Sequence, residues 1–431
     1  MAAKYPLCRR PSTASEPYST AAVGLAGGAA MARFEALDAW RGICALLVVL
    51  FHFCFIFTSP LMDARLVANA YLFVDFFFVL SGFVVCHAYR DRLGDAASWL
   101  SFVVRRFGRL WPLHAVLLAA FVAFIGMVNL LPHPERFDLT WTDSEYSIVG
   151  IGIYAMLLNA VNLHGMAWNA PSWSIGAEFY TYLLFGAVCV LTRGRLSLAA
   201  GVLALLSVGL LAAVSPTYMN STADFGLFRC VAGFFTGVVA YRVHEAMGER
   251  MRRLPPLAAT MLEVAAVALV VLFVARAGRG PDAVRAVSLG APLMFAAAVL
   301  VFATEGGQVS RLLRVRPLAA LGRWSYSIYM GHQLVLMATL YAVWAFARWQ
   351  GLDIEAPVTI EGHTKTLYDL GGTAGSLAML ALVLSAVIAL AAFTFTHVEE
   401  PARRAFNGIA GRMDARGGRL QASARRVSRA S

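Results

Sequence analysis

Charged residues are scarce in this 431-residue sequence, and the scarcity limits what it can be. Only 14% of the residues are Asp, Glu, Lys or Arg, whereas 59% are hydrophobic. A soluble protein of this length would form two or three domains of roughly 150 residues. The charged residues are too few to cover the surfaces of such domains. The composition also excludes a disordered chain and a coiled coil. The sequence therefore predicts an all-α polytopic membrane protein.

Cysteine is also sparse, and no cysteine pattern points to a metal. The six cysteines are Cys8, Cys44, Cys54, Cys86, Cys189 and Cys230, and none shows CxxC or Cys/His ligand spacing. Five of them fall in apolar runs, where cysteine behaves as a small hydrophobic residue. We interpret them as structural and expect no disulfide scaffold and no metal site.

The charge that is present is mostly positive. Lys and Arg number 36 against 25 Asp and Glu, a net charge of +11. In a soluble protein this excess would suggest nucleic acid as a partner. Here the cations lie between long apolar runs, the pattern by which membrane proteins fix their orientation, so no nucleic acid partner is expected.

The apolar runs predict a bundle of about ten transmembrane helices, because a bilayer core of about 30 Å requires roughly 20 apolar residues per helix. We expect three regions: a disordered cytoplasmic N-terminal tail at 1–35, a transmembrane domain at 36–404 and a basic cytoplasmic tail at 405–431. Met31 is an alternative start. The runs lie at 36–58, 69–89, 112–131, 173–192, 196–214, 227–244, 257–275, 284–303, 318–347 and 373–397.

An eleventh apolar run, 147–165, competes for the membrane. If it crossed, the arginine-rich tail at 405–431 would lie outside, against the positive-inside rule. The sequence therefore predicts a re-entrant or interfacial segment at 147–165. Both termini are then cytoplasmic, in the inner membrane of a bacterium.

Ionisable side chains in apolar helices are the first functional candidates, because each costs about 2.5–3.5 kcal/mol to insert. Arg41 and His52 are eleven residues apart in the first run. That spacing places them on one helix face with a rise of about 16 Å, Arg41 near the cytoplasmic end. They would suit one long ligand held at both ends. The alternative is an interfacial anchor and a packed histidine.

The second run contains Asp75 near its external end and Ser81 beside Gly82 in the middle. Asp75 is predicted to orient and charge-balance His52 from the neighbouring helix, as a carboxylate does for a catalytic imidazole. Ser81 and Gly82 favour close helix packing over nucleophilic chemistry.

Arginines gather at the cytoplasmic entry to the third helix, where Arg105, Arg106 and Arg109 precede Pro112. Arg106 and Arg109 are three residues apart and share a face, and guanidinium groups suit phosphate. The alternative is a basic cytoplasmic loop with no ligand.

Later runs supply further polar candidates. Glu178 is a candidate acid, base or sugar ligand, and Trp173 could stack on a sugar ring. Arg229 is a reasonable partner for Glu178. Tyr326, Tyr329 and His332 form a stripe on one helix, which polar packing explains equally well. A belt anchor and a surface acid are the alternatives for Trp173 and Glu178.

Six blocks in a fixed order carry a family resemblance: LDAWRGICALLVVLFHF, VDFFFVLSGFVV, RRFGR followed by WP, PSWSIGAEFY, LGRWSYSIYMGH and VEEPARR. Over about 37–404 the chain resembles the membrane acyltransferase-3 family. That family transfers acyl groups, usually acetyl from acetyl-CoA, to hydroxyls of extracytoplasmic sugars. The resemblance implies that Arg41 and His52 are the essential pair, that Arg106 and Arg109 are the RxxR pair, and that Glu178 is the acid of the later motif.

These observations lead to one functional hypothesis. Acyl-CoA is the co-substrate, with its phosphates on Arg105, Arg106, Arg109 and Arg41 and its thioester near His52. His52, assisted by Asp75 or Glu178, either accepts the acyl group or deprotonates the acceptor hydroxyl. Trp173, Arg229, Tyr326 and His332 are expected at the acceptor, an extracytoplasmic glycan. The alternatives are a small lipid or antibiotic-like acceptor, or a proton-coupled transporter, which would normally show repeat-related helices.

Overall fold

The computed structural model describes residues 34–142, 145–163, 165, 168–192, 194–278, 286–360 and 363–430. The predicted tail at 1–35, apart from its last two residues, and the alternative start Met31 lie outside the described residues.

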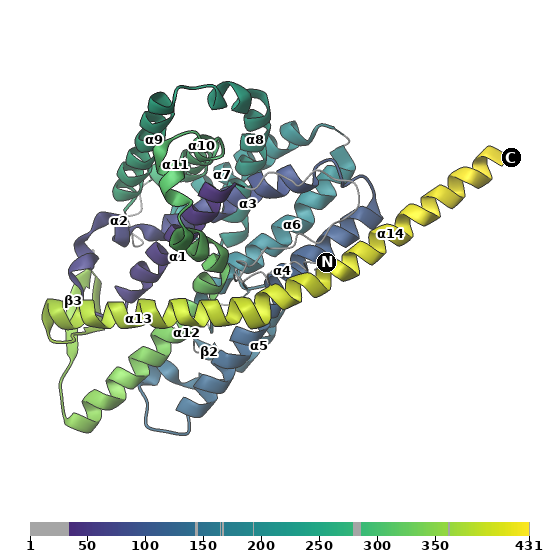
Figure 1. Cartoon of the computed structure of the whole chain (residues 1–431). Helices are drawn as coiled ribbons and strands as arrows, with labels where there is room; N and C mark the ends of the chain where they lie inside the picture. Colours follow the sequence, from purple (N-terminus) through teal and green to yellow (C-terminus); the bar gives the residue numbers. More distant parts are fainter. Residues whose placement is uncertain are drawn as a thin grey trace, which may run out of the picture. The chain divides into compact units, whose positions relative to one another are not determined.

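Helices account for most of the described chain (Figure 1). The long ones are α1 (Glu35–Phe53), α3 (Phe73–Tyr89), α4 (Ala96–Val128), α6 (Trp173–Thr192), α7 (Leu196–Val214), α8 (Gly226–Arg252), α9 (Pro256–Arg276), α12 (Arg316–Gln350), α13 (Gly372–Thr394) and α14 (Glu400–Ala430). The shorter ones are α2 (Arg65–Ala68), α5 (Ile148–Ala155), α10 (Ala291–Phe302) and α11 (Gln308–Leu313). Short 3-10 turns connect them at η1 (Pro60–Asp63), η2 (Ala70–Leu72), η3 (Glu135–Phe137), η4 (Ala170–Ser172), η5 (Tyr218–Asn220) and η6 (Ala286–Gly290).

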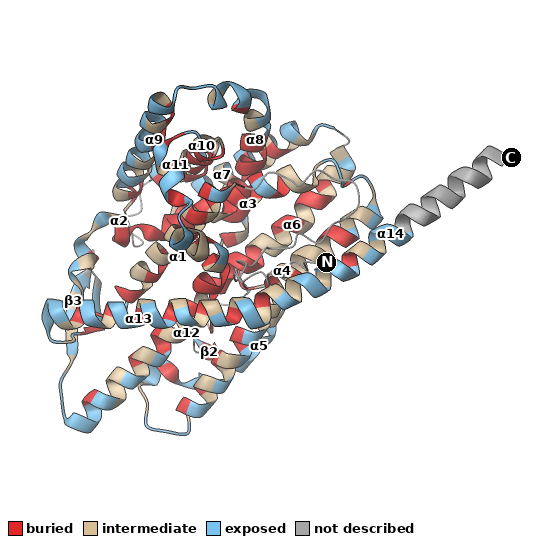
Figure 2. Cartoon of the chain, in the orientation of Figure 1, coloured by how far each residue is buried: buried red, intermediate tan, exposed pale blue. Residues whose placement is uncertain are grey.

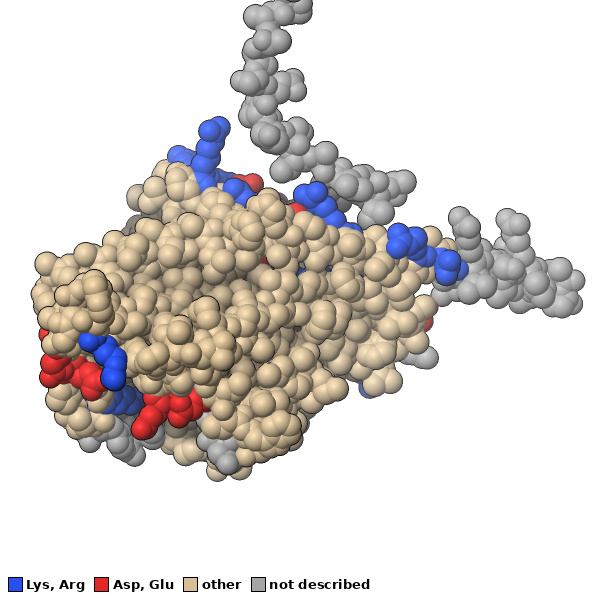
Figure 3. Space-filling model, turned by 90° about the horizontal axis from the view of Figure 1, so that it is seen from below, with Lys and Arg blue, Asp and Glu red and all other residues tan. Residues whose placement is uncertain are grey.

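Nine helical segments within the described ranges are long and apolar enough to cross a membrane. The tenth predicted run, 284–303, is represented by a shorter apolar helix at Ala286–Phe302. The space-filling view agrees, because a broad area without charged side chains separates charges at its left edge from the mainly basic upper and right edges (Figure 3). The prediction of an all-α polytopic membrane protein is confirmed.

Within its described residues, the segment 147–165 contains no helix able to span a bilayer. Its helix α5 has eight residues, about 12 Å at 1.5 Å per residue. Two side chains of α4 hold its end: Trp111 Nε1 donates to the Ala155 carbonyl at 3.0 Å, and His114 Nε2 to the Tyr154 carbonyl at 2.8 Å. The segment therefore folds against the bundle, as a re-entrant segment would.

Two strand pairs, which the apolar pattern does not predict, lie between helices. β1 (Leu139–Thr140) pairs in parallel with β2 (Tyr146–Ser147), and β3 (Glu355–Ile360) forms an antiparallel hairpin with β4 (His363–Tyr368). The hairpin is tied to the chain just after α1, because Thr58 N donates to Tyr368 O at 3.1 Å and Tyr368 N donates to Ile56 O at 2.9 Å. The first helix therefore ends at Phe53, before the end of the apolar run at 58.

Helix α3 lies at the centre of the bundle and packs closely on α8; the central ribbon is largely buried (Figure 2). Glycines permit this approach. A Cβ built on Gly82 would lie 1.8 Å from the Phe234 carbonyl oxygen, and one on Gly237 would lie 1.9 Å from the Val79 carbonyl oxygen. Backbones this close leave no room for any side chain.

Replacing Gly82 with valine should therefore separate α3 from α8 and destabilise the bundle by about 3 kcal/mol or more, at the upper end of overpacking costs. Thermal unfolding of the detergent-purified protein measures the effect. Gly201→Val is the matched control, since Gly201 also lies in a helix but a Cβ built on it would have nothing within 4 Å. Equal melting temperatures for the two variants would contradict the packing assignment.

The C-terminal helices run almost without a break, since a π-helical turn, η7 (Phe395–Glu399), joins α13 to α14. Figure 1 shows them in yellow. The first part of α14 packs along α4, where Phe406 lies against Gly108 and contacts Phe107 with ring centroids 5.8 Å apart. The predicted basic tail is thus helical.

Candidate active site

Helix α1 runs unbroken through both Arg41 and His52. The geometry of a regular helix therefore applies, and the two residues are separated by about 16 Å of rise. Both side chains are partly exposed, so neither is sealed in the core. This helix links one polar region near its start to another near its end.

The region near the end of α1 is a pair of histidines, His52 and His332 of α12. His332 Nε2 lies 3.3 Å from His52 Nδ1, and the ring centroids are 4.8 Å apart. His52 Nδ1 also lies 2.9 Å from the Val48 carbonyl oxygen, and His332 Nδ1 lies 2.6 Å from the Tyr329 carbonyl oxygen. His332 is fully buried, whereas His52 is the partly exposed member. We refer to them as the histidine pair.

The other region contains Arg41, Arg106, Arg109, Glu178 and Glu399, which we call the inner polar cluster. Ser81 Oγ and Tyr182 OH each donate to Glu178 Oε1 at 2.5 Å. The Arg106 guanidinium lies 5.7 Å from the Tyr182 ring centroid and donates to Tyr89 OH at 3.2 Å. Ser81 therefore binds the acid as well as lying beside the packing glycine, a polar contact that the packing interpretation missed.

Glu399 completes this cluster and was not among the predicted site residues. It lies in the π-helical turn η7, is 4% exposed, and accepts a hydrogen bond from Ser327 Oγ at 2.9 Å. Electrostatic interactions join it to both Arg41 and Arg109. Turns of this kind often occur at functional sites. The VEEP letters were the available signal, but hydropathy does not show which acid faces inward.

The predicted phosphate-binding arginines differ in whether they already have hydrogen-bond or ion-pair partners in the protein. Arg105 Nη2 pairs with Asp414 Oδ2 of α14 at 2.5 Å, and Arg41 pairs loosely with Asp38 at 3.6 Å. Arg109 makes no hydrogen bond or ion pair with any described residue. Two buried guanidinium nitrogens, Arg105 Nη1 and Arg106 Nε, also lack a hydrogen-bond partner among the described residues. These free donors could hold an anionic ligand.

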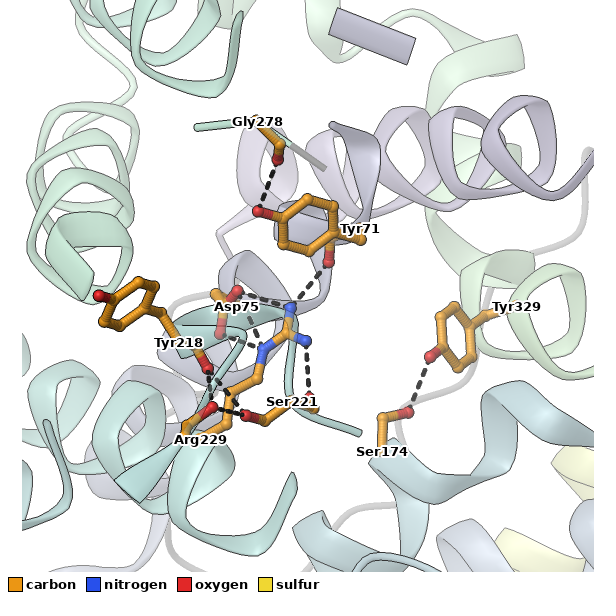
Figure 4. Close-up of polar contacts among 9 residues, drawn as sticks. Tyr71, Asp75, Ser174, Tyr218, Ser221, Arg229, Gly278 and Tyr329 are labelled. Atoms are coloured by element: carbon orange, nitrogen blue, oxygen red, sulfur yellow. Dashed lines mark hydrogen bonds and ion pairs between the residues drawn. The ribbon is translucent and has the colours of Figure 1, made fainter. Parts of the chain in front are cut away.

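Asp75 does not orient His52, which corrects that prediction. It is fully buried and paired with Arg229, whose Nε donates to Oδ1 at 3.0 Å and whose Nη2 donates to Oδ2 at 2.8 Å (Figure 4). Arg229 also donates to the carbonyl oxygens of Tyr71 and Ser221, at 2.8 and 3.0 Å. The pair is therefore internally satisfied, so Arg229 is neither the partner of Glu178 nor available to an acceptor.

Two other residues expected at the acceptor are also occupied inside the bundle. Trp173 is 4% exposed. The Arg229 guanidinium lies over the Trp173 ring, 5.2 Å from the ring centroid. Tyr326 OH donates to the Leu110 carbonyl at 2.6 Å, and this side chain is 7% exposed. A sugar could not stack on Trp173 without displacing this packing. Of the four predicted acceptor residues, His332 is the one that the structure brings to His52.

Comparison with known proteins gives four findings. The chain matches the family described as "Acyltransferase domain" over residues 34–397. It is 30% identical over 184 residues to "Protein 2 in picA locus" of Rhizobium radiobacter, covering 40% of this chain and 93% of that relative. It is 29% identical over 293 residues to "Acyltransferase MdmB" of Streptomyces mycarofaciens, covering 61% of this chain and 67% of that relative. No solved structure matches the chain.

Proposed function

Because the chain belongs to the membrane acyltransferase-3 family, we propose that it transfers an acyl group, acetyl in the simplest case, from cytoplasmic acyl-CoA to a hydroxyl of an extracytoplasmic glycan. The protein is a multi-pass membrane acyltransferase. Helix α1 joins the cationic cluster to an accessible imidazole, and this is the observation that supports the proposal most directly.

The inner polar cluster fits the nucleotide end of acyl-CoA. Its three guanidinium groups outnumber its two carboxylates, and Arg109 has no hydrogen-bonded partner among the described residues. CoA carries several phosphate charges, and arginine binds phosphate through paired N–H groups. With the phosphates near Arg41 and Arg109, the flexible arm of the co-substrate would extend along α1 toward His52.

His52 supplies the chemistry in this proposal. Its imidazole either removes the proton of the acceptor hydroxyl or attacks the thioester carbonyl itself. In the first route the hydroxyl oxygen attacks the carbonyl carbon, the C–S bond breaks, and the proton held by His52 passes to the leaving thiolate. In the second route His52 attacks the carbonyl carbon, the C–S bond breaks and CoA leaves as the thiolate. The acceptor hydroxyl then takes the acyl group from His52 and gives up its proton, which balances the thiolate. Both routes place a positive charge on His52 for part of the cycle.

Arg109→Ala is expected to raise the KM for acetyl-CoA by about 10- to 100-fold. That range corresponds to loss of one hydrogen bond to a charged group, about 1.5–3 kcal/mol. Initial rates of thiol release at varied acetyl-CoA measure it. Arg404→Ala is the control, because Arg404 is exposed and bonded to Glu400 on α14. An unchanged KM in Arg109→Ala would remove this residue from the donor site.

Asp414 should compete weakly with acetyl-CoA for the Arg105 guanidinium. Asp414→Asn frees the guanidinium, and we expect the KM for acetyl-CoA to fall by less than about fivefold, since exposed ion pairs contribute about 0–1 kcal/mol. Saturation curves for the two proteins at low salt test this. A rise in KM would show instead that Asp414 positions Arg105 for binding.

The direction of transfer and the orientation are part of the proposal, with both termini in the cytoplasm of a bacterium and the inner membrane as the location. The arginine-rich segment 405–431 supports it through the positive-inside rule. The test uses sealed inverted membrane vesicles given labelled acetyl-CoA from outside. Base-labile label should accumulate in the glycan inside the vesicles. Label that is confined to the outer face would overturn the direction.

A further inference from the structure

The hydrogen bonds of the histidine pair define which ring nitrogens carry protons, and the proposed function does not use this information. A carbonyl oxygen only accepts, so the proton between His332 and the Tyr329 carbonyl must be on His332 Nδ1. In the neutral ring, His332 Nε2 then carries a lone pair. The same reasoning at Val48 places a proton on His52 Nδ1.

These two assignments determine the remaining contact. His52 Nδ1–H points at His332 Nε2 across 3.3 Å and is shared with the Val48 carbonyl at 2.9 Å. His52 Nε2 is then the unprotonated nitrogen. It is the atom able to take a proton or an acyl group, and it belongs to the more exposed ring of the pair.

From this geometry we infer that His332 is a positioning residue for the acyl transfer, accepting the His52 Nδ1–H bond in the way the carboxylate of a catalytic triad does. The inference rests on the proposed function. Asp75, the acid expected in that place, is bound to Arg229 instead. His332 is suited to the task because it is fully buried and its own ring is held by the Tyr329 carbonyl.

The hydrogen bond from His52 to His332 becomes stronger during the reaction. Whether His52 Nε2 gains a proton or an acyl group, its ring becomes cationic while Nδ1–H remains in place. A hydrogen bond from a cationic donor is roughly twice as strong as a neutral one, so His332 stabilises the charged state more than the resting state. A group that acts in this way affects kcat and leaves the binding of acyl-CoA unchanged.

The test compares His332→Ala and His332→Gln in the purified full-length protein, with acetyl-CoA as donor and methyl β-D-glucoside as the acceptor probe. His332→Ala should lower kcat by about 10- to 100-fold, the range known for groups that orient a metal-bound imidazole, with the KM for acetyl-CoA within about twofold. His332→Gln supplies an amide oxygen that can accept the bond and should recover much of the rate.

His114 gives the matched control, since it is another fully buried histidine bonded to a carbonyl, that of Tyr154. His114→Ala should leave kcat nearly unchanged at the same loss of thermal stability. The inference is overturned if His332→Ala keeps its kcat, if its loss equals that of His114→Ala, if glutamine gives no recovery, or if only a KM changes. A wild-type protein that releases no thiol from acetyl-CoA overturns the proposed function itself.

Discussion

Replacing His52 with alanine is expected to lower acyl transfer by about 100- to 10,000-fold while the protein remains folded in the membrane. General acid–base catalysis contributes about 10²- to 10⁴-fold. The neighbouring His332 cannot replace it, because His332 is fully buried and its ring is held by the Tyr329 carbonyl. Labelled acetyl-CoA given to membranes that contain the variant measures the loss. The amount of full-length protein in those membranes is measured alongside.

His397 is a suitable control for this variant. Its Nδ1 lies 2.9 Å from the Phe393 carbonyl four residues earlier, the same local contact that His52 makes with Val48, but its ring is exposed. His397→Ala should therefore transfer acyl groups at the normal rate. More than about a tenth of the wild-type activity in His52→Ala would contradict the proposed mechanism.

Breaking the pair of Asp75 and Arg229 should cause the largest loss of stability. Both side chains are fully buried, and removing one leaves the other charge without its partner in an apolar bundle. Such losses are about 3–5 kcal/mol. Asp75→Ala and Arg229→Ala should each reduce the yield of folded protein and lower its melting temperature in detergent.

The double variant Asp75→Leu, Arg229→Met distinguishes the effect of an unpaired charge on stability from the effect of altered packing. Because it leaves no unpaired charge, it should recover a large part of the stability lost by either single variant. Glu249→Ala is the control, since it breaks an exposed ion pair with Arg252 and should leave the melting temperature unchanged. Single variants that melt at the wild-type temperature would show that the buried pair contributes little.

The helices and the shared face of Arg41 and His52 could be predicted because both depend on local pattern. Hydropathy over about 20 residues defines a span, and helix geometry fixes what lies eleven positions away. The predicted partners of the polar groups were less successful. Asp75 and Arg229 are 154 residues apart in sequence, and His52 and His332 are 280 apart, so only tertiary packing selects these pairs.

Two further features depend on details that hydropathy does not encode. A π-helical turn rotates Glu399 toward the inner polar cluster, whereas the letters VEEP are compatible with either acid facing inward. The hairpin of β3 and β4 has strands of only six residues each, between two long apolar runs. Its presence also explains why the first helix is shorter than its apolar run.

The hydrogen bonds that attach that hairpin are made by main-chain atoms, at Ile56, Thr58 and Tyr368, while the side chains of Leu367 and Tyr368 are buried in the same hydrophobic cluster as Ile56. Backbone N–H and C=O groups are the same for every residue type except proline, so these hydrogen bonds do not restrict which residues occupy the exposed positions of the hairpin, such as Thr359 and Thr364. Those exposed positions can thus vary in sequence while the main-chain bonds between the hairpin and the segment after α1 are kept.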